Sequence, residues 1–224
     1  MQDDTLIVED VLLLMLDDKT GAAAGAGTQH LGLAGAVLVE LALLGRIQQD
    51  GTGTWYQGKR VVATGEGPLP DPLLQSTYDA IAARPQDIYT LLATIGFPLS
   101  EPVIERLIQR GLLRRERKRF LGLIPTTSLP ATNTGHESAL RKQMSVVLED
   151  GVHPDPRLTA VIATISASGT LVLLNPLPKW SGRVATRAKE IEQGNWVAAA
   201  LSIAVAGATA SAAASAAAIA STSS

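Results

Sequence analysis

The strongest chemical signal in this sequence is a run of basic residues between positions 110 and 119. It holds six Lys or Arg residues against one Glu, a local charge of +5 in a chain whose formal net charge is −2. The six are Arg110, Arg114, Arg115, Arg117, Lys118 and Arg119. Basic residues near an anionic lipid surface are worth roughly 1 kcal/mol each. The run therefore predicts an anion-binding surface that binds the headgroups of anionic phospholipids.

The residues around this run, LLRRERKRFLGLIPTTS, predict two strands joined as a hairpin. Strand alternation would place the odd-numbered residues 115–119 on one face and the even-numbered ones on the other. Phe120 and Leu121 follow at the tip or on the return strand, where we expect them to contact a membrane or a second copy of the chain. The alternative is a solvated hairpin whose charges protect an exposed strand edge.

Other spacings with chemical meaning are weaker. Residues 53–59, GTWYQGK, have the spacing of a phosphate-binding loop, but Arg60 stands where Ser or Thr must reach Mg²⁺. A strand follows instead of a helix, so a glycine-rich hairpin is favoured. Cysteine is absent and the three histidines have no ligand spacing. We expect no catalytic residues, no metal and no cofactor, and therefore not an enzyme.

The element that must support these residues is the segment 31–44, LGLAGAVLVELALL. A helix that is apolar on all sides is normally buried on all sides, and this one is shorter than the roughly 20 residues of a membrane span. We predict a buried central helix that ends at Gly45. Its single charge, Glu40, must be paired with an Arg or with backbone N–H groups.

Helical periodicity and capping residues predict the remaining elements. Helices are expected at 5–16, 72–84, 86–95, 101–110, 134–149, 156–168, 183–193 and from 196 onward, and strands within 46–64 and 112–128. Asp71, Asp155 and Asn195 are expected to cap the helices that follow them, and Thr134 and Glu137 match a capping box. The fold class is mainly α: a single globular domain of helices around a buried central helix, with β-hairpins.

The two ends of the chain carry their own signals. The acidic N-terminus lacks the pattern of a signal peptide, so we expect a cytoplasmic protein. No charged residue occurs from Trp196 to Ser224. We expect a domain over residues 1–207 with a packed final helix, and a frayed Ala/Ser-rich tail over 208–224. A membrane anchor is the alternative for this tail, although Ala contributes little to insertion.

Two stretches, LIVEDVLLLMLDDKTG and LGLAGAVLVELALLGRI, resemble the Golgi phosphoprotein 3 family. Members of this family share an acidic, Leu-rich first helix, a D-K-x-G turn, and a G-L-x-G motif before an apolar run ending in E-L-A-L-x-G-R. Further matches are HPDPRLTAVIATISASG and the helix that begins at Trp196. The resemblance covers nearly the whole chain, and the Ala-rich composition is typical of a bacterial, actinobacterial-type relative.

The resemblance implies a fold and a function. It implies a helical domain around a buried helix, with a β-hairpin used in oligomerisation and membrane contact. Eukaryotic members bind phosphatidylinositol 4-phosphate and the cytoplasmic tails of glycosyltransferases. For this chain it implies a peripheral membrane adaptor on the cytoplasmic face of the membrane, with anionic phospholipid, partner proteins and further copies of itself as partners.

The family's lipid pocket does not carry over residue by residue. The family has a Trp in the loop before the central helix, where this chain reads GAAAGAG over 21–27. The Arg of the family's G-L-R-G motif is Ala34 here, and residues 97–100 contain no Arg. None of the pocket residues that align is retained, whereas the basic hairpin is.

Two other functions fit parts of the sequence. A helix, a Gly and a basic hairpin are also the outline of a winged helix, so residues 99–123 predict a nucleic-acid-binding alternative. The helix at 101–109 carries two Glu and one Arg, and phosphates would repel its net negative charge. The other alternative is an inert interaction scaffold that binds neither ligand.

Overall fold

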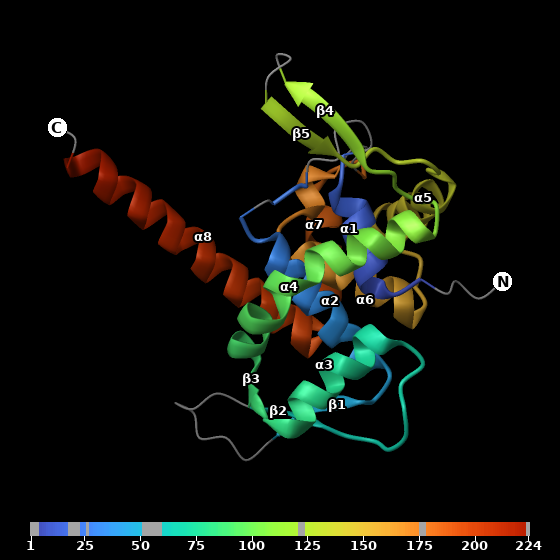
Figure 1. Cartoon of the computed structure of the whole chain (residues 1–224). Coiled ribbons are helices and arrows are strands. Elements are labelled where there is room, and N and C mark those ends of the chain that lie inside the picture. The colour runs from blue at the N-terminus through green and yellow to red at the C-terminus, as the bar shows by residue number, and fades with distance from the viewer. Residues whose placement is uncertain are drawn as a thin grey trace.

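The structure is mainly α-helical with two small antiparallel sheets, which confirms the predicted fold class (Figure 1). This computed structural model describes residues 5–17, 23–25, 27–50, 60–120, 124–174 and 178–222, with only the backbone for 117–120, 124–127 and 217–222. The helices are α1 (Ile7–Met15), α2 (Gln29–Leu43), α3 (Pro72–Ala83), α4 (Ile88–Gln109), α5 (Gly135–Asp150), α6 (Pro156–Ala167), the 3₁₀ turn η1 (Leu171–Leu173), α7 (Gly182–Gln193) and α8 (Trp196–Thr222). The strands are β1 (Ile47–Gln49), β2 (Arg60–Ala63), β3 (Gln86–Asp87), β4 (Glu116–Phe120) and β5 (Ile124–Ser128).

Helix α2 lies at the centre, with α1, α4, α6 and α8 packed around it (Figure 1). Residues 31–41 are all buried, which confirms the predicted central helix. Gly45 follows the helix with φ of +68°, and the N–H of Arg46 donates to the carbonyl of Leu41. This closing turn is typical of a glycine-terminated helix.

Gly35 and Gly96 allow the closest helix contacts. A Cβ at Gly35 would meet Leu201 of α8 at 2.6 Å, and a Cβ at Gly96 of α4 would meet the carbonyl oxygen of His30 at 2.2 Å. Because glycine has no Cβ, α8 can lie close to α2 at Gly35, and α4 can lie close to α2 at Gly96.

Helix starts follow the predicted capping residues at three places. The carboxylates of Asp71 and Asp155 accept N–H groups of Leu73 and Leu158 at 2.8 and 2.9 Å. Asn195 accepts the N–H of Val197 at 3.0 Å at the start of α8. The capping box at Thr134 and Glu137 is wrong: Asn133 accepts the N–H of Gly135, and the Glu137 carboxylate is bound by Arg141.

Helix α4 corrects the prediction of two helices at 86–95 and 101–110. It is one helix from Ile88 to Gln109, begun by the Asp87 carboxylate, and it runs through Pro98 and Pro102. Each proline removes one backbone donor, but packing against α1 and α2 keeps the segment helical. Residues 86–87 form β3, which pairs with β2. The expected hairpin turn at 53–59 lies outside the described residues.

Helix α8 is the last element of the described chain. Its start is buried at Val197, Leu201 and Val205, and it continues as a helix to Thr222 through the Ala/Ser-rich segment. Alanine is the strongest helix former, which explains the continuation. Figure 1 shows this part of α8 projecting away from the body. The division into residues 1–207 and 208–224 stays a prediction.

Candidate functional site

The basic run lies where α4 ends and the β4–β5 hairpin begins. Gly111, with φ of +71°, turns the chain after α4, and the buried Leu112 and Leu113 fix the base of the hairpin to the core. The N–H of Arg114 donates to the carbonyl of Pro130 at 3.1 Å. In Figure 1 the hairpin projects from the body. The predicted strands are confirmed, and the first three basic residues lie before the strand.

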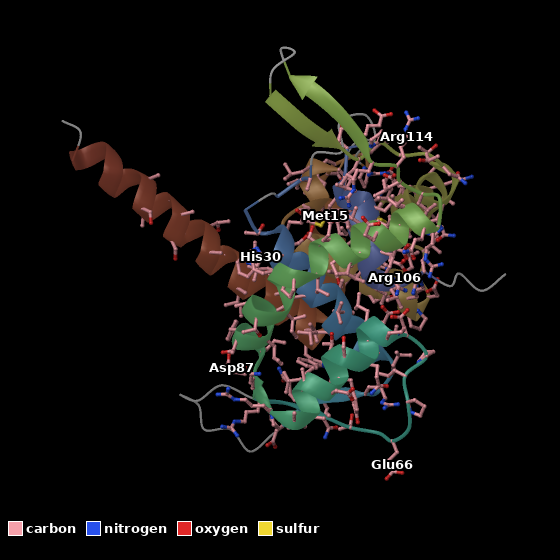
Figure 2. All side chains as sticks on the ribbon, viewed as in Figure 1. Met15, His30, Glu66, Asp87, Arg106 and Arg114 are labelled. Atoms are coloured by element: carbon pink, nitrogen blue, oxygen red, sulfur yellow. The ribbon has the colours of Figure 1, made fainter. Side chains whose placement is uncertain are left out.

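Those three basic residues are ion-paired at the base of the hairpin. Arg110 Nε lies 2.8 Å from Glu9 Oε1, and Arg114 Nη2 lies 2.6 Å from Glu116 Oε1. Figure 2 labels Arg114 beside the hairpin base, away from its tip. The charge of +5 counted along the sequence is therefore larger than the local charge in the fold.

Arg115 is held by two carboxylates of α4. Its Nη2 lies 2.5 Å from Glu101 and 2.7 Å from Glu105. The hydrogen bond to Glu101 raises the pKa of the Arg115 guanidinium, and the charge of Glu105 adds to this. Arg115 therefore links the start of the hairpin to α4. Residues 101–109 belong to α4, so among the described residues they do not form the separate recognition helix of a winged helix.

The other three basic residues, Arg117, Lys118 and Arg119, lie within β4. Their partners in β5 are Thr127, Thr126 and Pro125, which carry no charge. Phe120 pairs with Ile124 at the far end of the ladder. The backbone alone is described here, so the predicted alternation of side chains stays a prediction. Leu121 lies outside the described residues.

The sequence interpretation missed a buried ion-pair network around α1, in which Glu9 pairs with residues of α4. Glu9 is fully buried, accepts the N–H of Leu6 at 2.7 Å, and lies 3.3 Å from Arg106. Arg106 also binds Asp71, the cap of α3, at 2.6 Å. Burial opposes the charge of Arg106, but the bond to Asp71 and the charge of Glu9 outweigh it and raise the Arg106 pKa.

The second half of this network surrounds Asp10. Its two carboxylate oxygens lie 2.6 Å from Arg157 of α6 and 2.7 Å from His136 of α5. These residues line an open cavity of about 220 Å³. The sequence signal was available, since Glu9 and Asp10 are adjacent charges inside an apolar helix. Among the described residues, no group of three or more His, Cys, Asp or Glu is placed to hold a metal ion.

Glu40 joins the network from the central helix and confirms that its carboxylate needs partners. Its Oε2 accepts the N–H of Ile7 at 3.0 Å, and its Oε1 lies 3.7 Å from Arg157. Burial raises the pKa of the Glu40 carboxyl to about 7, while the Ile7 N–H and Arg157 act in the opposite direction. The nearby charges of Asp10 and Asp71 raise it further.

The region of the lipid pocket implied by the resemblance has a different composition in this fold. Ala34 is fully buried in α2. Phe97 is 71% exposed and stacks on His30 with ring centroids 4.1 Å apart. Figure 2 shows His30 near the start of α2, beside the base of α8. Burial lowers the pKa of His30. The described part of this region therefore holds a stacked His–Phe pair in place of converging arginines.

Two findings describe the chain as a whole. Among the described residues, one stretch, Trp196–Ala216 of α8, is long and apolar enough to cross a membrane, with a mean hydropathy of 1.8. Residues 7–208 match the family model described as Golgi phosphoprotein 3 (GPP34).

Proposed function

Because the chain belongs to the Golgi phosphoprotein 3 (GPP34) family, we propose that it is a peripheral membrane adaptor rather than an enzyme. It binds anionic phospholipid headgroups on the cytoplasmic face of a membrane through the β4–β5 hairpin. The observation that carries this proposal is the strand register, in which Arg117, Lys118 and Arg119 face uncharged partners on a projecting hairpin.

The charges set the strength of this contact. At roughly 1 kcal/mol per basic residue near anionic lipid, three residues contribute about 3 kcal/mol, which holds a protein only weakly. Such an interaction is screened over about 10 Å at 0.1 M salt. Stable attachment therefore needs a second contact or several hairpins on one oligomer. Both fit an adaptor that joins a membrane to partner proteins.

Phosphatidylinositol 4-phosphate is the headgroup that the family resemblance implies. A phosphomonoester carries more charge than a phosphodiester and favours converging guanidinium groups. Here Ala34 replaces the Arg of the family's motif, so the hairpin residues are the proposed contact with the headgroup. A panel of vesicles with phosphatidylinositol 4-phosphate, phosphatidylserine or cardiolipin at equal charge decides whether the phosphomonoester is preferred.

The test is co-sedimentation with vesicles. We expect binding to require anionic lipid, to fall with salt, and to drop roughly a hundredfold in the variant Arg117→Ala/Lys118→Ala/Arg119→Ala, because about 3 kcal/mol of headgroup attraction is lost. The matched control, Arg60→Ala/Arg84→Ala/Lys142→Ala, removes three exposed basic residues elsewhere. It therefore has the same net charge as the hairpin variant. We expect this control to bind as the wild type does.

Two results would contradict the proposal. Equal sedimentation of the hairpin variant and the wild type would remove the hairpin from the lipid site. A mobility shift of DNA at low salt, lost in the same variant and without vesicle binding, would assign the hairpin to nucleic acid. Flat results in both assays would leave the inert scaffold as the interpretation.

A further inference from the structure

Helix α8 is longer than the body can cover. Residues from Trp196 to Val205 pack on the core, where Leu201 contacts Gly35 of α2. Beyond Val205 the helix leaves the body: Ala208 keeps a partial contact with the core, and residues 209–216 are all exposed. Residues 206–222 span about 25 Å at 1.5 Å per residue. This projecting segment of α8, residues 206–222, is called the α8 arm below.

The composition of the α8 arm differs from that of an ordinary exposed helix. It carries no Asp, Glu, Lys or Arg, although exposed helices of soluble proteins carry charges on the face away from the core. Its described hydroxyls are satisfied by the helix itself. Thr209 donates to the carbonyl of Val205 at 3.0 Å, and Ser211 and Ser215 donate to the carbonyls of Gly207 and Ser211 at 2.9 and 3.0 Å.

A hydroxyl that donates to a carbonyl of its own helix costs less free energy to move from water into an apolar phase. A hydroxyl that enters an apolar phase without a hydrogen-bond partner loses its bonds to water and gains nothing in return. Each described Ser and Thr of the α8 arm already has a partner, so this cost is largely absent. The arm therefore presents a neutral, apolar cylinder to any surface it meets, which favours lipid over a charged protein or nucleic-acid partner.

We propose that the α8 arm is a second, apolar contact with the lipid bilayer, lying at a shallow angle in the interfacial region. This inference rests on the proposed function, in which the hairpin supplies the electrostatic contact. In Figure 1 the hairpin projects from the body at the top and the arm projects from it at the left. Stable membrane attachment commonly needs two signals, such as one apolar anchor and one basic patch.

The geometry favours contact over spanning. The first turns of α8 hold Val197 and Leu201 in the core, so the whole helix cannot cross the bilayer without unpacking. The arm, at about 25 Å, is shorter than the roughly 30 Å hydrocarbon core. Its last carbonyls need hydrogen-bond partners, which headgroups and water supply at the interface. A shallow position satisfies both requirements.

The first experiment changes the apolarity of the arm without changing its charge. Ala210→Leu/Ala214→Leu adds apolar area at two exposed positions one helical turn apart, and Ala210→Gln/Ala214→Gln adds polarity there. On vesicles with 30% phosphatidylserine, we expect the Leu pair to raise the partition coefficient roughly tenfold and the Gln pair to lower it several-fold. Both effects persist at 0.5 M salt, since apolar burial is not screened.

The second experiment locates the arm directly. The chain contains no cysteine, so Ala214→Cys accepts a single environment-sensitive fluorophore. We expect its emission to shift to the blue on vesicles, whereas a label at Ala82→Cys, an exposed position on α3, stays unshifted. A blue shift that appears without vesicles and grows with protein concentration would assign the arm to self-association and overturn the proposal.

The two proposals fail in different ways. If the hairpin variant sediments as the wild type does while the Leu and Gln pairs change partition, the hairpin assignment is wrong and the arm stands. If the Leu pair, the Gln pair and the wild type partition equally and the label at position 214 stays unshifted, the arm makes no lipid contact. Salt-sensitive binding lost in the hairpin variant would then leave the proposed function intact.

Discussion

At the scale of single residues, Glu40 is the group whose chemistry depends most on its surroundings. It is 7% exposed and lies between the Ile7 N–H and Arg157, with Asp10 and Asp71 nearby. Burial disfavours the ionised carboxylate more than its partners favour it, so the pKa rises from 4.5 to about 7. The folded protein therefore keeps a proton that the unfolded chain releases.

This proton makes the stability depend on pH in a defined direction. Between about pH 4.5 and 7 the folded state binds more protons at Glu40 than the unfolded state, so its contribution to stability falls as pH rises and levels off above 7. The variant Glu40→Gln lacks this proton. We expect the unfolding free energy of the wild type, relative to Glu40→Gln, to decline by up to about 3 kcal/mol over this window.

Urea unfolding of both proteins at pH 5, 6, 7 and 8 measures this difference. Glutamine still offers an oxygen to the Ile7 N–H, so the variant keeps the local contact and isolates the ionisation. Unfolding free energies that run parallel over the whole pH range would show that Glu40 does not titrate there.

At the scale of elements, helix contacts depend on glycines at the points of closest approach. Helix α4 meets the start of α2 at Gly96, where an added Cβ would lie 2.2 Å from a backbone oxygen. A backbone atom cannot rotate away as a flexible side chain can, so α4 would have to move. Gly96 therefore sets the separation of α2 and α4, the two helices that share the most extensive contact among the described elements.

The variant Gly96→Ala tests this separation. We expect it to lower the unfolding free energy by roughly 2–3 kcal/mol or more, since overpacking a tight contact costs about that amount. The control is Gly207→Ala, where the added Cβ meets nothing within 4 Å in the α8 arm. We expect the control to be neutral or to gain up to about 1 kcal/mol of local helix stability. Thermal unfolding followed by circular dichroism compares the two, and equal midpoints would refute the close contact.

At the scale of the whole molecule, the ion-pair network makes α1 the point where distant segments meet. Glu9 joins α1 to α4, Asp10 joins it to α5 and α6, and Glu40 joins it to α2. The network holds the base of the hairpin through Arg110, and Figure 1 shows the hairpin projecting from the body. Buried charges therefore link α1 to the helices around it within the apolar core, and the hairpin and the α8 arm project from the body.

The variant Glu9→Ala is expected to destabilise the whole fold. It leaves Arg106, Arg110 and the Leu6 N–H without their buried acceptor, and breaking a buried pair costs about 3–5 kcal/mol. The control Glu190→Ala removes an exposed carboxylate from α7 and is expected to stay within about 0.5 kcal/mol of the wild type. Urea unfolding at pH 8 measures both. A Glu9→Ala midpoint equal to that of the control would contradict a structural role for the network.

Most signals that are local along the chain predict the structure correctly, with the capping box at Thr134 and Glu137 as an exception. The central helix, the caps at Asp71, Asp155 and Asn195, the strands of the hairpin and the family resemblance all follow from periodicity and neighbouring residues. The need of Glu40 for a partner also followed, because a charge inside an apolar helix must be paired wherever the helix lies.

Tertiary packing decided the rest. The partners of the basic run came from Glu9, which is 101 positions from Arg110, and from Glu101 and Glu105 on α4. Packing also kept α4 continuous through Pro98 and Pro102, against their local preference. Whether a charge is paired, and whether a proline ends a helix, depends on the residues that are close in space. The periodicity of the sequence does not predict which segments pack together in the core. The sequence by itself determined which residues are basic, and only the fold decided which of them are neutralised at the base of the hairpin.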